Sequence, residues 1–201
     1  MKLYDFPFAP NPRKTRVYLA EKGLEIPKVM VNIVKGEQNE PAFLAKNPMG
    51  GLPVLELGDG TCLRESLAII EYLEELHPEP PMIGTTPLER AQVRALERTA
   101  DLGVLGPVAR VFHGTRAVLP GRQPNAELAA MGRRDLERPA RWLATQMRDG
   151  RPFVAGPRVT IADCTLFAAM EFARTGDLDL DWPRELADWF ARFRERPSAA
   201  A

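Results

Sequence analysis

The first 77 residues alternate between strand and helix spacing. Apolar side chains recur at every second position in Val29, Val31 and Ile33, which predicts a strand. The predicted elements cover residues 3–6 (strand), 11–23 (helix), 28–33 (strand), 38–46 (short helix), 54–57 and 61–63 (strands) and 66–76 (helix). Their order is β-α-β-α-β-β-α. A helix joins the first two strands, so we expect them to be parallel, and a tight turn joins the last two, so we expect an antiparallel hairpin.

The rest of the chain shows no strand alternation and predicts an all-helical unit. Helix starts are indicated by capping residues at Thr86, Asn125 and Thr160, and by Trp182-Pro183. The first of these helices is expected to run to His113. Between the two units, residues 78–86 contain three prolines and a glycine, which is typical of a stiff connection. The predicted domains are therefore residues 1–77 and 87–201, with 78–86 as the linker.

Composition narrows the classes of function. Lys and Arg together number 27, equal to Asp and Glu, so the net charge is zero and nothing draws the chain to nucleic acid or an anionic membrane. The two cysteines, Cys62 and Cys164, lack metal-ligand spacing, and no apolar stretch is long enough to span a membrane. We expect a soluble protein of the cytoplasm that binds no metal.

Three motifs in order resemble those of the cytosolic glutathione transferases. They are Asn47-Pro48-Met49-Gly50-Gly51-Leu52-Pro53-Val54-Leu55, Leu63-Arg64-Glu65-Ser66-Leu67-Ala68-Ile69-Ile70-Glu71-Tyr72-Leu73 and Val159-Thr160-Ile161-Ala162-Asp163. The resemblance covers almost the whole chain. It implies an α/β plus all-α fold, in which a thioredoxin-like β-α-β-α-β-β-α domain precedes a C-terminal helical bundle. It also implies a homodimer that binds glutathione as a substrate.

The first two motifs supply the expected glutathione contacts. The resemblance implies a cis Leu52–Pro53 bond, which would leave the N–H and C=O of Leu52, beside Gly51, free to pair with an extended peptide. Without the resemblance, a trans proline would be the default. Ser66 is predicted to be a helix N-cap, where free N–H groups also suit a carboxylate. Glu65 is either a solvated charge or the acceptor for the ammonium of glutathione, and within this motif we favour the second.

Gln38 lies in the segment Lys35-Gly36-Glu37-Gln38, which resembles the KGEQ stretch of nu-class transferases. That resemblance implies a contact between Gln38 and glutathione. The composition alone is equally typical of a solvent-facing helix start. Both interpretations stay open at this stage.

The segment from Asp5 to Lys14 departs from the family pattern, because it contains no Ser, Thr, Cys or Tyr. Family members place a hydroxyl or thiol here against the glutathione sulfur, where a donor stabilises the nucleophilic thiolate. Asn11 is the remaining candidate. It is predicted to be the helix N-cap, and its amide NH₂ would still be able to donate to sulfur. Arg13, Lys14 and Arg16 add positive charge nearby, and most of them are expected to face solvent.

Phe8, Val108, Phe112 and His113 are candidates for the wall of an apolar co-substrate pocket, although each one separately is equally typical of core packing. The leading hypothesis is an enzyme that activates the glutathione thiolate for attack on an electrophile, or on a disulfide or peroxide. The alternative is a non-catalytic binding or interaction protein of the same fold, suggested by the missing hydroxyl. The retained Pro53 and Glu65-Ser66 elements favour the enzyme.

Overall fold

The computed structural model describes residues 1–201 and begins with a four-stranded sheet. Its strands are β1 (Lys2–Asp5), β2 (Lys28–Met30), β3 (Val54–Glu56) and β4 (Cys62–Arg64), in the spatial order β2-β1-β3-β4. β1 and β2 are parallel, whereas β3 is antiparallel to both β1 and β4. The predicted parallel pair and hairpin are therefore confirmed.

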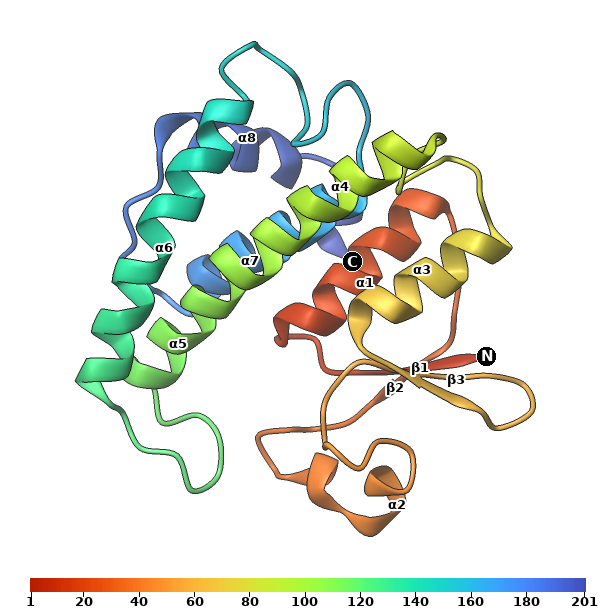
Figure 1. The fold of residues 1–201 in the computed structure, drawn as a ribbon. Coiled ribbons are helices and arrows are strands. Elements are labelled where there is room, and N and C mark those ends of the chain that lie inside the picture. Colours follow the sequence, from red (N-terminus) through yellow and green to blue (C-terminus); the bar gives the residue numbers. More distant parts are fainter.

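Helices cover both faces of this sheet. α1 (Pro10–Lys22) and α3 (Ser66–Leu76) pack against each other on one side, and α2 (Pro41–Leu44) lies on the other (Figure 1). The short helix predicted over residues 38–46 is instead divided into a 3-10 turn, η1 (Glu37–Asn39), and α2, because Glu40 between them has an extended backbone. The residue before a proline is biased toward that conformation, and Pro41 follows Glu40.

The remaining chain is helical, as predicted. Its elements are α4 (Pro87–Ala100), the π-helical turn η2 (Asp101–Leu105), α5 (Gly106–Thr115), α6 (Ala126–Gln146), α7 (Ile161–Thr175), α8 (Arg184–Arg194) and the 3-10 turn η3 (Pro197–Ala200). The single long helix expected to reach His113 is thus interrupted by η2. Thr86 and Asn125 cap α4 and α6 as predicted, since each side chain accepts a backbone N–H bond. No helix is both long and apolar enough to cross a bilayer.

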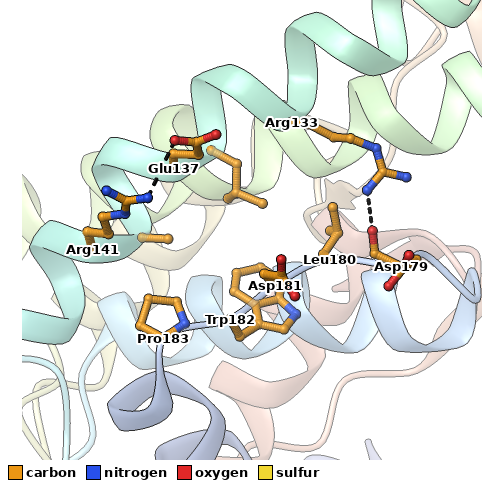
Figure 2. A pocket seen from close by; sticks show the side chains of 10 residues that line it. Arg133, Glu137, Arg141, Asp179, Leu180, Asp181, Trp182 and Pro183 are labelled. Carbon is orange, nitrogen blue, oxygen red and sulfur yellow. Dashed lines mark hydrogen bonds and ion pairs between the residues drawn. The ribbon is translucent and has the colours of Figure 1, made fainter.

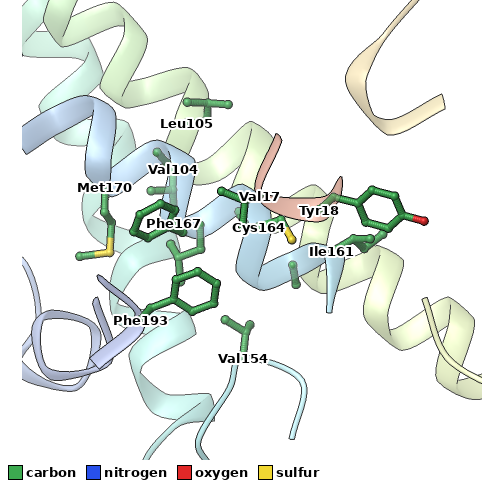
Figure 3. Close-up of a cluster of buried hydrophobic side chains, with 14 of the residues drawn as sticks. Val17, Tyr18, Val104, Leu105, Val154, Ile161, Cys164, Phe167, Met170 and Phe193 are labelled. Atoms are coloured by element: carbon green, nitrogen blue, oxygen red, sulfur yellow. The ribbon is translucent and has the colours of Figure 1, made fainter. Parts of the chain in front are cut away.

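α7 is the central helix of the core, and every residue from Ile161 to Ala173 is buried. Figure 3 shows Phe167 and Cys164 of α7 among side chains from α1, α8 and the 153–155 segment. Because Val17 and Tyr18 of α1 belong to the same continuous cluster as α7, the sheet-containing part and the helical part share one core. Helix α1 is therefore held from both sides, and this fixes the position of its N-terminal end.

Candidate active site

The register of the sheet places three separate loops at one end of it. Tyr4 of β1 lies opposite Val54 of β3, and Val54 lies opposite Arg64 of β4. The chain leaves β1 here toward α1, enters β3 here from Pro53, and leaves β4 here toward α3. The segments that the sequence analysis singled out, around Asn11, Leu52-Pro53 and Glu65-Ser66, are consequently brought together although they are distant in sequence.

Asn11 is not the N-cap of α1, so that prediction was wrong. Helix α1 begins at Pro10, and Ala9 occupies the cap position without a side-chain hydrogen bond. Pro10 suits the first helical position because its φ is preset and its missing N–H would have had no partner there. Asn11 is therefore the second helical residue, and its exposed side chain does not cap the helix.

Ser66 is likewise one position inside its helix rather than at the cap. Glu65 takes the N-cap position of α3 with a φ of 68°, a left-handed conformation that is rare for a residue with a side chain. Ser66 is buried, and its hydroxyl donates a hydrogen bond of 3.5 Å to Oδ1 of Asn11. The N-terminal ends of α1 and α3 therefore meet at these two side chains.

The N-terminal turn of α3 has hydrogen-bond donors to spare. The backbone N–H groups of Ser66, Leu67 and Ala68 have no acceptor within the chain. The exposed carboxylate of Glu65 takes part in no ion pair or side-chain hydrogen bond. Unpartnered N–H groups at a helix start attract an anion, and a carboxylate beside them accepts from an ammonium. Free donors beside a free carboxylate match a group that carries both a carboxylate and an ammonium, as the zwitterionic end of an amino acid does.

The loop before β3 offers an unused backbone edge. The Leu52–Pro53 bond is cis, as the resemblance implied. Neither the N–H nor the C=O of Leu52 is hydrogen-bonded within the chain, whereas the carbonyl of Gly51 accepts from the Asn47 side chain at 2.8 Å. An extended peptide is able to pair with such a free donor and acceptor as an added strand.

Gln38 lies on η1 beside this loop. A side chain at Gly50 would come within 3.3 Å of the carbonyl oxygen of Gln38 and 3.8 Å of its Cγ, so the two segments are in contact. The side-chain oxygen Oε1 of Gln38 is buried and has no hydrogen-bond partner. Buried polar atoms in proteins are nearly always satisfied, which points to a donor supplied from outside the chain.

Two of the three cations in the first turns of α1 do not face solvent, contrary to expectation. Lys14 is buried against Glu97 and Asp101, and Arg16 is buried with its Nη1 2.5 Å from Oδ1 of Asp5. Arg13 is partly buried and has no carboxylate within ion-pair distance; it donates to the carbonyl of Pro7 at 3.4 Å. Burial, together with the charge of Arg16, lowers the pKa of Arg13.

An apolar cavity of about 330 Å³ adjoins the β1–α1 loop. Phe8, which is 68% exposed, and Phe112 line it as predicted. Residues that the sequence analysis did not assign to this cavity also line it: Phe6, Val34, Arg116, Val118, Phe172, Thr175 and Gly176. Phe172 packs on Phe112 with ring centroids 4.6 Å apart. No local signal marked Phe172, because its apolar position in α7 is equally typical of the core.

The other two predicted pocket residues do not line this cavity. Val108 is completely buried in the core, which agrees with the alternative interpretation that it is a core-packing residue. His113 lies with its ring 5.3 Å from that of Phe112, and its Nδ1 is buried without a partner. Burial, with a smaller effect of Arg122, lowers the pKa of His113 below its ordinary value of 6.5.

A second cavity, of about 620 Å³, lies between α6 and the segment from Asp179 to Pro183 (Figure 2). Three of its charged side chains already interact within the chain: Arg141 forms an ion pair with Glu137, and Arg133 donates a hydrogen bond to the carbonyl of Asp179. None of the predicted site residues lines it. No group of three or more His, Cys, Asp or Glu side chains is arranged to hold a metal ion.

Comparisons with known proteins identify the family of the chain. A model described as "Glutathione S-transferase, N-terminal domain" matches residues 3–81, and one described as "Glutathione S-transferase, C-terminal domain" matches residues 125–196. Glutathione S-transferase 2 of Saccharomyces cerevisiae is 38% identical over 98% of this chain and 87% of its own length.

Two solved structures extend the likeness to the whole fold. The crystal structure of Gtt2 from Saccharomyces cerevisiae has a TM-score of 0.90 and 36% identity, covering 100% of this chain and 99% of that one. A glutathione S-transferase from Methylobacterium radiotolerans, solved in complex with glutathione sulfonate, has a TM-score of 0.82 and 30% identity, covering 99% and 92%. The second protein holds a glutathione derivative on the same scaffold.

Proposed function

The chain belongs to the glutathione S-transferase family, and on that premise we propose which of its residues bind glutathione and activate its sulfur. It is a glutathione-dependent enzyme of the thioredoxin-like transferase fold. The observation that carries the assignment is the meeting of two helix starts at Asn11 and Ser66, 3.5 Å apart, at the same end of the sheet as the free backbone of Leu52.

The γ-glutamyl group of glutathione binds at the start of α3. Its carboxylate accepts from the free backbone N–H groups of Ser66 and the two residues after it, and its ammonium donates to Glu65. The peptide part pairs with the N–H and C=O of Leu52, next to Gly51 and Pro53. Gln38 accepts a donor of the peptide at its unpartnered Oε1. The unused hydrogen-bonding groups of this chain support each of these contacts.

The thiol of glutathione lies against the start of α1, where the amide NH₂ of Asn11 donates to sulfur. A free cysteine thiol has a pKa of about 8.5 and is mostly protonated at neutral pH. Donation from Asn11 and the positive end of the α1 dipole favour the thiolate. The thiolate then forms a bond to an electrophilic carbon held in the apolar cavity by Phe8 and Phe112. The leaving group departs with its bonding electrons, and the thiol proton passes to solvent.

Three properties of the whole protein belong to the same proposal. The domain boundaries are residues 1–77, 78–86 and 87–201, and the three prolines of segment 78–86 support this division. The enzyme is a homodimer, a state supported by the exposure of Leu88 and Leu102, each 69%. It works in the cytoplasm, where reduced thiols persist, and both of its cysteines are free. Sedimentation velocity tests the oligomeric state.

A pH titration of bound glutathione tests the proposed function. The ultraviolet absorbance of the thiolate is followed while the protein is saturated with glutathione. We expect saturable binding and a thiol pKa clearly below that of free glutathione. Saturable binding with an unshifted pKa contradicts activation by Asn11, and absence of binding contradicts the site as a whole.

A further inference from the structure

The apolar cavity beside the β1–α1 loop contains one charged side chain, that of Arg116. Phenylalanine and valine side chains make up most of the wall, and no carboxylate lines it. The Arg116 side chain is 43% exposed, so water reaches part of its guanidinium, but the apolar wall offers it no acceptor and a ligand with a negative group would supply one. The cavity is therefore apolar with one fixed cation.

The hydrogen bonds of Arg116 leave part of its guanidinium unused. Nη2 donates to the carbonyl oxygens of Gly176 and Asp177, at 3.3 Å and 3.0 Å. Nε and Nη1 donate to no acceptor of the chain. These two carbonyls lie just after α7, so the same bonds orient the guanidinium at the edge of the cavity. The two N–H groups of Nη1 therefore remain as free donors for a carboxylate.

Nearby negative charge does not neutralise Arg116. The carboxylate of Asp177 is 3.7 Å away but its side chain is fully exposed, and an exposed pair contributes little. Glu171 of α7 is already held by two hydrogen bonds from Arg174. Arg13, which contacts the carbonyl of Pro7 between the two pocket residues Phe6 and Phe8, has no carboxylate partner. Neither Arg116 nor Arg13 therefore has a buried carboxylate partner within the chain.

From these contacts we propose that the electrophilic co-substrate is an aromatic molecule with a carboxylate, and that Arg116 selects for that carboxylate. The ring packs among Phe8, Phe112 and Phe172, and the carboxylate accepts from Nη1 of Arg116. This inference rests on the proposed function, because it names the substrate class of the same site. Arg116 acts here as a specificity-determining residue and takes no part in activating the thiol.

The first test measures binding without chemistry. The ligands are para-methyl-meta-nitrobenzoate and its methyl ester, which share ring and shape but lack a leaving group. By calorimetry, we expect the acid to bind the wild type about tenfold more tightly than the ester. In Arg116→Gln this preference should shrink to about twofold or less. An ester that binds as well as the acid, or a preference that survives in the variant, overturns the proposal.

Two further variants separate recognition from stability. Arg116→Lys keeps the charge and is expected to retain part of the preference for the acid, even where Tm falls as the contacts to Gly176 and Asp177 weaken. Arg134→Gln removes an exposed arginine of α6 that is in no ion pair and is expected to change nothing. If Arg116→Gln lowers Tm but leaves the preference intact, its role is structural and the proposal fails.

The second test adds turnover, with glutathione and para-chloro-meta-nitrobenzoate or its methyl ester. The thiolate sulfur bonds to the ring carbon and chloride leaves with the bonding pair. We expect Arg116→Gln to lower kcat/KM for the acid about tenfold more than for the ester. If neither is turned over while the unreactive acid still binds through Arg116, the proposed thiol transfer fails, and only the recognition of the carboxylate by Arg116 stands. If both are turned over with equal dependence on Arg116, the inference fails and the proposed function stands.

Discussion

The ammonium of Lys14 lies 3.3 Å from Oε1 of Glu97, and both side chains are excluded from solvent. Glu97 also accepts from the hydroxyl of Thr165 at 3.0 Å and from Nε of Arg98 at 2.7 Å. The buried charges thus join α1 to α4 and α7. Lys14 is one turn beyond Asn11, so the pair fixes the helix end that is proposed to hold the glutathione sulfur.

Lys14→Met is expected to lower the free energy of unfolding by about 1.5–3 kcal/mol, because the buried carboxylate of Glu97 loses its ammonium partner while Arg98 and Thr165 still donate to it. Urea unfolding followed by circular dichroism measures this. Arg184→Met is the control: its pair with Asp188 is exposed, and we expect a loss of about 1 kcal/mol or less. Equal effects of the two substitutions would contradict a structural role for the buried pair.

Asn11→Ala is expected to raise the pKa of bound glutathione toward the ordinary value of about 8.5 and to lower kcat about tenfold to a hundredfold. The reason is the loss of the amide donor to sulfur, while the γ-glutamyl contacts remain. Glutathione affinity should therefore change much less than kcat. The readouts are thiolate absorbance against pH and steady-state kinetics, with Asn125→Ala, at the distant cap of α6, as the control. Unchanged turnover in Asn11→Ala would refute the assignment.

Glu65→Ala is expected to weaken glutathione binding about tenfold to a hundredfold, since a hydrogen bond to a charged group contributes about 1.5–3 kcal/mol. Calorimetry measures the dissociation constant directly. Glu75→Ala on the same helix is the matched control, because Glu75 is exposed and in no ion pair. If the two variants bind glutathione equally well, Glu65 is only a solvated charge.

Glu21→Gln tests a pH-dependent contact between the C-terminal turn and α1. Glu21 is partly buried, which raises its pKa, but hydrogen bonds from Arg196 and Ser198 outweigh this and lower the pKa below 4.5. A carboxylate with a lowered pKa stabilises the fold above the unfolded value and loses that contribution as the pH falls through the folded value.

The wild type should therefore be more stable than Glu21→Gln at pH 7, and the difference should shrink as the pH falls below about 4.5. Chemical unfolding at a series of pH values measures it, and Glu25→Gln, which changes an exposed residue of no ion pair, serves as the control. A difference that grows on acidification would show that Glu21 is protonated in the fold.

Patterns within short segments predicted most of the architecture. The hairpin turn at Asp59-Gly60 and the cap at Asn125 each depend on neighbouring residues, and the strand pairing and helix start agree with them. The alternation at Val29, Val31 and Ile33 predicted a strand over residues 28–33, but β2 ends at Met30, so the prediction was too long. Local patterns misplaced the N-cap by two residues at Asn11 and by one at Ser66. Pro10 and the left-handed Glu65 moved the two helix boundaries, and the composition of each segment suited either position.

The residues proposed to bind glutathione could be predicted from the sequence, because the groups that would contact the ligand lie within a few positions of one another in motifs such as Leu52-Pro53 and Glu65-Ser66. The burial of Lys14 and the joining of Phe8, Phe172 and Arg116 around one cavity could not be predicted in this way. Those contacts join segments far apart in sequence, and they exist only once α1, α5 and α7 pack around a common core. Packing, rather than local propensity, therefore decided which charges are buried and what surrounds the co-substrate.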